Sequence, residues 1–433
     1  MLASILLEAL LVRALLPADY SNWILALSFS LIAIVITQFG YQTSAIKIFG
    51  RFHHANTRGF HSALAGAGVI WGIAASVLLI IFTFTFEVFF HSKDAELFWA
   101  IYAMTITRGI NTALAEGMRG IGHIAISATL GGLGQHGGLL RIFGVGTAIV
   151  LLDITGKLDL TNILWASSLV SVFASAILII VALKAIQDPR KVTFTSTLSA
   201  ITMDLSSNFR LMIAQLTQLG SSRFAANLIG GALSLGSALT PFMLAQQMTQ
   251  LILAPLTIVN GAIPNLIMDA HKQNNLNELE KIVRTSATIA FFTSLVVSII
   301  LISAGPHFFQ LLFGVDQGQA FVFFLILVPG FLFNSFTGSA VRALALLGEE
   351  QAYAVTSFFI TIVAIPLYII SGTVGGITGL AASTSLIIIF QNFLYLRLAY
   401  VKLGIRSHAY LSPRYIMPVI RNLKSKRKNK ATR

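Results

Sequence analysis

Residues 286–304 read SATIAFFTSLVVSIILISA, an apolar stretch without a single charged side chain. An α-helix rises about 1.5 Å per residue and the hydrocarbon core of a bilayer is about 30 Å thick, so this stretch is typical of a membrane-spanning helix. Further apolar stretches lie at 1–16, 21–40, 63–88, 97–117, 126–152, 160–185, 206–231, 240–262, 321–345, 352–371 and 377–400. The sequence therefore predicts an all-α polytopic membrane protein with about twelve transmembrane helices.

The composition excludes several protein classes. Of 433 residues, 56% are hydrophobic and only 10% are charged, whereas a soluble domain carries about 25% charged residues. So little charge cannot solvate the surface of a soluble particle of this size, which excludes a cytosolic enzyme, a disordered chain and a nucleic-acid-binding domain. The chain has no cysteine, so it cannot form a disulfide, a zinc–thiolate site or an iron–sulfur cluster.

The basic residues indicate how the chain is oriented. The net charge is +13. With a cytoplasmic N-terminus, the inner loops and the C-terminal tail carry twenty Lys and Arg residues, whereas the outer loops carry only Lys93 and Lys157. Cytoplasmic loops of membrane proteins are enriched in Lys and Arg. We therefore expect a multi-pass protein that is surrounded by membrane lipids and has both termini in the cytoplasm.

The predicted spans divide into two halves. Six precede the connection at 186–205 and six follow it, and an internal repeat of this kind is typical of secondary transporters. We expect an N-terminal six-helix lobe at 1–190, a C-terminal six-helix lobe at 191–403 and a basic cytoplasmic tail at 404–433. The tail contains KSKRKNK at 424–430, which suits contact with anionic lipid headgroups and needs no nucleic-acid partner.

One predicted span carries a stripe of polar residues. A polar group inside a membrane span costs free energy and therefore needs a reason. At about 100° per residue, five polar residues at 97–119 share an arc of about 80°: Thr105, Arg108, Thr112, Glu116 and Arg119. The stripe either lines a water-filled cavity or packs against another helix, with Arg108 paired to Glu116.

Two later spans carry amides and hydroxyls in similar stripes. One stripe contains Asp204, Asn208, Gln215, Gln218 and Ser222, and the other contains Gln246, Gln250, Thr257 and Asn260. Such groups suit sugar hydroxyls or water. Hydrogen bonds between helices would explain them as well, so both interpretations stay open.

Three single charges need separate interpretations. Arg141 follows the run GGLGQHGG at 131–138, whose glycines permit either a gating hinge or close helix packing. Arg223 lies within the span 206–231. Glu8 lies in the middle of the first span, where it is a candidate for coupling to H⁺ or Na⁺ or for a salt bridge to a neighbouring helix.

No enzyme motif accompanies these residues. The sequence contains no H-E-x-x-H metal motif, no nucleophile elbow and no P-loop for a nucleotide. We therefore expect a secondary transporter that has no enzymatic activity and no bound cofactor.

Several stretches resemble a known superfamily. They are VRALLPADY at 12–20, GMRGIG at 117–122, FMLAQQ at 242–247 with LAPLT at 253–257, and GGITGLAA at 375–382. Their order and spacing resemble the multidrug/oligosaccharidyl-lipid/polysaccharide exporter superfamily, and specifically its polysaccharide flippase branch of the O-antigen or teichoic-acid type. One position departs from that pattern, because Ser21 stands where the family has a glycine after the first-hairpin tyrosine.

The resemblance implies a flippase of the bacterial cytoplasmic membrane. Such a protein moves a polyprenyl-diphosphate-linked oligosaccharide from the inner to the outer leaflet by alternating access, alongside glycosyltransferases and a polysaccharide polymerase. Guanidinium groups bind phosphate through paired hydrogen bonds, so Arg108, Arg141 and Arg223 are candidates for the diphosphate. The other candidates for substrate contact are Glu116, Gln215, Gln218, Gln246 and Gln250.

Two alternatives to the flippase stay open. A cation-coupled multidrug exporter of the same superfamily would bind cationic drugs in an acidic cavity. The arginines deep in the spans, Arg108, Arg141 and Arg223, outnumber the deep acids, Glu8 and Glu116, which favours an anionic cargo. The second alternative, a membrane-embedded polysaccharide polymerase or ligase, is disfavoured by the short outer loops.

Overall fold

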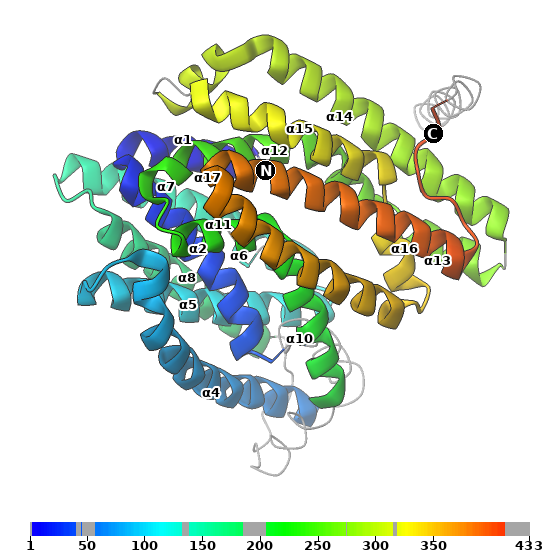
Figure 1. The fold of residues 1–433 in the computed structure, drawn as a ribbon. Coiled ribbons are helices and arrows are strands. Elements are labelled where there is room, and N and C mark those ends of the chain that lie inside the picture. Colours follow the sequence, from blue (N-terminus) through cyan, green and yellow to red (C-terminus); the bar gives the residue numbers. More distant parts are fainter. Residues whose placement is uncertain are drawn as a thin grey trace, which may run out of the picture. The chain divides into compact units, whose positions relative to one another are not determined.

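The computed structural model describes residues 2–39, 45, 57–131, 138–184, 205–273, 275–314 and 318–411. Within these ranges every regular element is a helix (Figure 1). Seven of the described helices are long and apolar enough to cross a membrane. The chain is a helical polytopic membrane protein, which confirms the predicted fold class.

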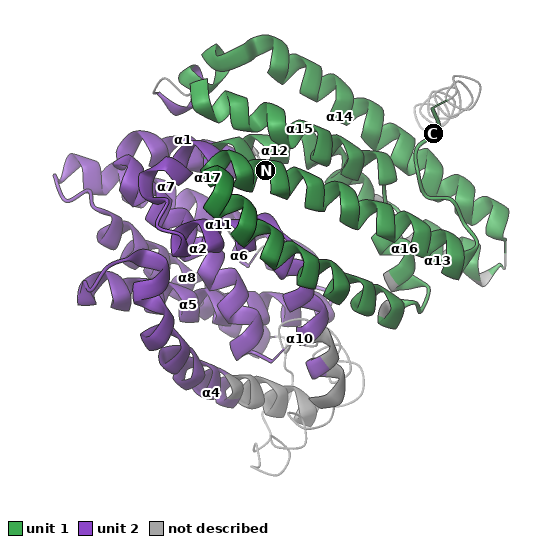
Figure 2. Cartoon of the chain, in the orientation of Figure 1, with its two compact units in different colours: residues 1, 244–310, 316–433 green, residues 2–243, 311–315 purple. Residues whose placement is uncertain are grey.

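The chain forms two compact units, and one of them contains residues 2–243 and 311–315 (unit 2, purple in Figure 2). Its helices are α1 (Leu2–Ala14), α2 (Pro17–Thr37), α4 (Thr57–Phe90), α5 (Ala95–Gly120), α6 (Ile124–Leu130), α7 (Leu139–Ile154), α8 (Leu160–Lys184), α10 (Leu205–Gly220), α11 (Arg223–Ala232) and the 3₁₀-helix η1 (Gly236–Ala238).

Local sequence signals set where two helices of unit 2 begin. Pro17 opens α2, since its fixed φ suits a first helical turn. The Asp94 side chain caps α5 by accepting a hydrogen bond from the Glu96 N–H at 2.9 Å.

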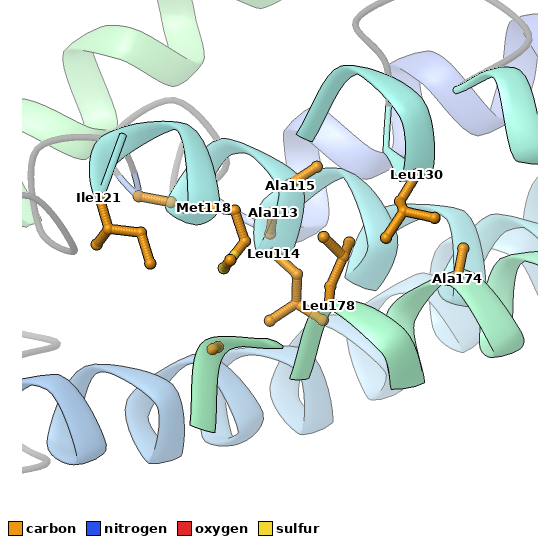
Figure 3. Close-up of a cluster of buried hydrophobic side chains, with 10 residues drawn as sticks. Ala113, Leu114, Ala115, Met118, Ile121, Leu130, Ala174 and Leu178 are labelled. Carbon is orange, nitrogen blue, oxygen red and sulfur yellow. The ribbon is translucent and has the colours of Figure 1, made fainter. Parts of the chain in front are cut away.

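Helices α5 and α8 pack closely in this unit. A buried apolar cluster joins them and α6: Leu114 of α5 lies near Leu178 of α8, and Ala115 packs against Gly131 at the end of α6 (Figure 3). The hydroxyls of both helices bond to carbonyl oxygens on their own helix, at Thr105, Thr107 and Thr112 of α5 and at Ser168, Ser171 and Ser175 of α8. The α5–α8 seam is therefore apolar in character although hydroxyls lie along it.

The other unit contains residues 244–310 and 316–433 (unit 1, green in Figure 2). It holds most of α12 (Leu239–Ala262) and α14 (Leu276–Phe313), with α13 (Pro264–Lys272), α15 (Gly318–Thr337), α16 (Ala340–Leu346) and α17 (Glu350–Leu403). Its polar side chains bond across helices: Ser339 Oγ donates to Asn260 Oδ1 at 2.6 Å, Thr337 Oγ1 to Asn392 Oδ1 at 3.0 Å, and the Ser357 and Tyr395 hydroxyls lie 3.0 Å apart. These bonds join α12 to the start of α16, the end of α15 to α17, and the two halves of α17.

Two long helices are kinked at glycines. Gly376 lies inside α17 with a φ of 55°, and Gly305 lies inside α14 with a φ of 62°, directly before Pro306. Left-handed φ values suit glycine because it has no Cβ. The predicted spans 352–371 and 377–400 are therefore separate arms of α17 on either side of Gly376, and they lie side by side, since the Ser357 and Tyr395 hydroxyls are 3.0 Å apart.

Three spans that were predicted as continuous are broken. The predicted span 126–152 becomes α6 and α7, and residues 132–137 of its glycine run lie outside the described residues. The span 206–231 becomes α10 and α11, because Ser222 caps α11 by accepting a hydrogen bond from the Phe224 N–H at 3.2 Å. The span 321–345 becomes α15 and α16, because Gly338 turns the chain with a φ of 67°.

The predicted boundary between two six-helix lobes lies outside the described residues, so the lobes at 1–190 and 191–403 stay a prediction. The compact units divide later along the chain, after residue 243. Helices α10 and α11 belong to unit 2 because α10 packs against α2, and α11 packs against α2 and α4.

Candidate functional site

Two buried arginines lie near each other in unit 2. Arg108 on α5 and Arg141 on α7 are each only 4% exposed, and their positive charges repel each other. The Arg141 side chain reaches Ser167 on α8, donating to its Oγ from Nη2 at 2.8 Å and from Nε at 3.3 Å. Among the described residues, Arg141 Nη1 is buried and has no hydrogen-bond partner.

The two buried guanidinium groups disfavour each other's charge. Burying a charge costs several kcal/mol unless it is paired, and a second buried charge of the same sign adds to that cost. An anion between or beside the two guanidinium groups would offset both the cost of burying the charges and the repulsion between them. Arg141, a buried cation with a spare donor among the described residues, is therefore a candidate for binding an anion.

Glu116 has a different partner from the one that the stripe allowed. Its Oε2 accepts a hydrogen bond from Arg119 Nη1 at 3.1 Å, one turn along α5, so the observed ion pair joins Glu116 to Arg119 and replaces the alternative pairing with Arg108. A pair spaced by three residues is a common local contact on a helix. The carboxylate is largely engaged by its own helix, and direct contact between Glu116 and a substrate stays a prediction.

A second charged cluster joins three elements of unit 2. Glu8 on α1 and Tyr20 on α2 are fully buried, and Arg223 is the first residue of α11. Arg223 interacts electrostatically with both Glu8 and Tyr20, and the Tyr20 hydroxyl lies beside the Glu8 carboxylate. The three predicted phosphate-binding arginines therefore fall into two groups: Arg108 accompanies Arg141, and Arg223 accompanies Glu8.

The predicted amides are divided between the two units. Gln215 is half-buried and Gln218 is exposed on α10 of unit 2, whereas Gln246 is buried and Gln250 is half-buried on α12 of unit 1. The stripe predicted for residues 204–222 is wrong at its far end, because α10 ends at Gly220 and Ser222 caps the next helix.

Two residues of these clusters were missed by sequence reasoning. Ser167 begins a series of serines at four-residue spacing in the span 160–185, a signal of a polar face on a helix. Tyr20 belongs to the quoted first-hairpin stretch, but the sequence predicted no contact for it. The glycines next to Arg141 are packed closely, since a Cβ on Gly138 would lie 2.3 Å from the Thr129 carbonyl oxygen. This contact favours close packing there, and the gating hinge stays untested.

Comparison with known proteins gives a result at the level of the fold. No protein-family model and no curated protein matches the sequence. A solved inward-facing multidrug-resistance MATE transporter of the MOP (multidrug/oligosaccharidyl-lipid/polysaccharide) superfamily matches with a TM-score of 0.72, over 92% of this chain and 93% of its own, at 15% identity. This chain has the fold of MOP-superfamily transporters.

Further structures with the MOP fold agree. The lipid II flippase MurJ, in an inward closed conformation, matches with a TM-score of 0.67 over 96% of this chain and 87% of its own, at 12% identity. A MOP-superfamily transporter from Pyrococcus furiosus matches with a TM-score of 0.63 over 93% and 92% of the two chains, at 14% identity. The resemblance at the superfamily level is confirmed for the fold. At these identities the cargo does not follow from the neighbours.

Proposed function

We propose that this MOP-fold chain is a flippase that moves a polyprenyl-diphosphate-linked oligosaccharide across the bacterial cytoplasmic membrane. The observation that carries the proposal is the buried pair Arg108 and Arg141, whose charges repel each other, with Arg141 Nη1 unused in the described structure. A diphosphate needs cationic groups that pair with its charge if it is to pass through a medium of low dielectric constant. Two neighbouring guanidinium groups, one of them with a spare N–H donor, can pair with the diphosphate in this way.

The lipid tail and the sugars of the cargo also need a path and contacts. The polyprenyl tail stays in the bilayer while the headgroup passes through the protein by alternating access. The amides of Gln215, Gln218, Gln246 and Gln250 would contact sugar hydroxyls, and Glu116 would hold Arg119 in place at the inner end of α5. Enzymes that make and polymerise the oligosaccharide, glycosyltransferases and a polymerase, are the expected partners. MurJ, one of the neighbours with this fold, is a lipid II flippase, which supports a lipid-linked cargo.

The test of this function is the location of the lipid-linked oligosaccharide in a deletion strain. We expect the intermediate to accumulate in the inner leaflet, and wild-type protein to clear it. The variant Arg108→Gln, which removes the charge but keeps a polar side chain, should fail to clear it. An unchanged pool in the deletion strain, with lowered tolerance to cationic drugs, would overturn the flippase.

That last outcome would support the alternative of a cation-coupled multidrug exporter. One observation favours it: Glu8 is a fully buried carboxylate in unit 2, and cationic drugs bind to buried acids. The structural match to a multidrug-resistance MATE transporter is consistent with it. The flippase is preferred because Arg223 already interacts with Glu8, whereas the buried Arg141 Nη1, which has no hydrogen-bond partner among the described residues, suits an anion.

We further propose that Glu8 couples transport to H⁺ or Na⁺. A carboxylate next to Tyr20 and Arg223 exchanges its arginine partner for a cation, so each gradient ion that arrives changes how α1, α2 and α11 are held together. We expect Glu8→Gln to lower the stimulation of transport by an imposed gradient roughly tenfold, since one charge-assisted contact is worth about 1.5 kcal/mol or more.

This prediction is measured in proteoliposomes loaded with lipid-linked oligosaccharide, with and without a proton or sodium gradient. Glu87→Gln is the matched control, because Glu87 is an exposed carboxylate on α4 that pairs with Lys93 at 3.3 Å. Equal gradient stimulation in wild-type protein and in Glu8→Gln would exclude Glu8 as the coupling residue.

A further inference from the structure

The chain does not leave the fold at the end of α17. Gly404 turns it with a φ of 68°, and residues 404–411 form an extended strap along unit 1. Three strap N–H groups anchor it: Arg406 donates to Glu280 Oε2 at 3.1 Å, Ala409 to the Phe336 carbonyl oxygen at 2.9 Å, and Tyr410 to Thr288 Oγ1 at 2.8 Å. The side chains of Ile405, Ser407 and Ala409 are buried, whereas Arg406 and Leu411 are exposed.

Arg284 on α14 holds the strap from the other side. Its guanidinium lies over the Tyr410 ring at 3.9 Å from the centroid, its Nε donates to the His408 carbonyl oxygen at 3.3 Å, and its Nη1 donates to Glu280 Oε1 at 3.3 Å. The His408 ring stacks on Phe336, with 5.7 Å between the ring centroids. One face of the strap is therefore built from aromatic rings and a fixed guanidinium.

These groups line an open cavity of about 410 Å³. That volume lies within the usual range for small-molecule sites, roughly 300–1,000 Å³. Of the described residues that line the cavity, Arg284 and Arg406 are cationic, Phe336, Tyr410 and Leu411 are apolar or aromatic, and none is acidic. Within the described part of the chain, the Arg406 side chain forms no ion pair. The cavity thus combines an apolar wall with the positive charge of Arg406, while Arg284 is paired with Glu280 at 3.3 Å.

We infer that this cavity binds the phosphate group of an anionic membrane lipid. In the orientation predicted from the positive-inside distribution, the end of α17 lies at the inner leaflet, whose anionic headgroups attract cationic groups near the surface. Arg406 and Arg284 bind the phosphate oxygens, and Phe336 and Leu411 contact the start of the lipid's apolar part. The bound lipid also braces the strap against α14 and α15. The inference does not depend on which cargo the protein transports.

The test uses the purified full-length chain in detergent, with lipids added singly. Native mass spectrometry measures retention of phosphatidylglycerol, and hydrogen exchange measures protection of residues 404–411. We expect phosphatidylglycerol to bind and to protect the strap, and phosphatidylcholine to do neither. Arg406→Gln should weaken phosphatidylglycerol binding about tenfold, in line with the loss of one charge-assisted contact. The substitution leaves the backbone bond from residue 406 to Glu280 in place, so the strap stays anchored.

Lys402→Gln is the matched control, because Lys402 is an exposed cation at the end of α17 that pairs with Glu349 at 3.9 Å. It should bind phosphatidylglycerol as wild-type protein does. A polyprenyl diphosphate that displaces phosphatidylglycerol in an Arg406-dependent manner would support the site and identify the cargo lipid as its source. Three results would each overturn the inference. They are equal binding of phosphatidylglycerol by Arg406→Gln and wild-type protein, binding of phosphatidylcholine as tight as that of phosphatidylglycerol, and protection of residues 404–411 by inorganic phosphate equal to that by phosphatidylglycerol.

Discussion

Arg141→Gln is expected to reduce transport of lipid-linked oligosaccharide roughly 100-fold, because the charge-assisted contact of Nη1 with the diphosphate is lost and such a contact is worth about 1.5–3 kcal/mol. Arg141 lies beside Arg108 with Nη1 unused among the described residues, and the proposed flippase would use this donor to bind the diphosphate. Arg141→Lys keeps the charge but not the paired donors, and should retain part of the activity. The measurement is the rate of translocation in proteoliposomes.

The same substitution is expected to leave the unfolding temperature unchanged or to raise it. Removing one of two buried like charges relieves their repulsion and the cost of burying a guanidinium. If Arg141 binds the substrate, its substitution abolishes transport but leaves the protein stable. If Arg141 had a structural role, its substitution would lower both transport and stability. Arg342→Gln, which removes a cation on α16 that lies outside both charged clusters, is the control and should change neither quantity.

Gly338→Ala is expected to lower the free energy of unfolding by about 3 kcal/mol, from left-handed strain of roughly 1–2 kcal/mol and overpacking of roughly 1–3 kcal/mol. Gly338 has a φ of 67°, and a Cβ there would lie 2.4 Å from Ala287 Cβ and 3.0 Å from Ala287 Cα on α14. The backbone of α14 cannot move away easily, because it is packed in unit 1. Equilibrium unfolding in mixed micelles measures the loss.

Two companion variants separate the causes. Gly348 has a φ of 89°, and a Cβ there would have nothing within 4 Å, so Gly348→Ala carries the backbone strain without the overlap and should cost about 1 kcal/mol. Adding Ala287→Gly to Gly338→Ala should recover the packing part, which a double-mutant cycle reports as a coupling energy. A cycle without coupling would show that the contact with Ala287 is unimportant.

The membrane-spanning stretches could be predicted from hydropathy because each one must cover the bilayer with apolar side chains. The breaks at Ser222 and Gly338 could not, because a hydropathy window averages over the single residue that caps or turns a helix. Both signals are visible once sought, as a serine that caps the helix after it and a glycine between two short apolar runs. Chain continuity within an apolar stretch is therefore the weakest part of such a prediction.

The candidate site shows a similar limit. Arg108, Arg141 and Glu8 could be singled out from sequence, because each is a charge in an apolar stretch. Their grouping could not, since it depends on how α1, α5, α7 and α11 pack. The pairing of Glu116 with Arg119 could have been predicted from the sequence, because a separation of three residues places both on one helix face.

The internally bonded hydroxyls along α5 and α8 have a mechanical consequence. Thr105 and Thr112 on one helix and Ser171 and Ser175 on the other satisfy their hydrogen bonds within their own helix, so relative sliding of the two helices breaks none of these bonds. Unit 1 differs, since Ser339 and Thr337 tie separate helices together. A shift of α5 along α8 would therefore leave the hydrogen bonds of these hydroxyls intact, whereas a shift between α15 and α17 in unit 1 would break the bond of Thr337 to Asn392.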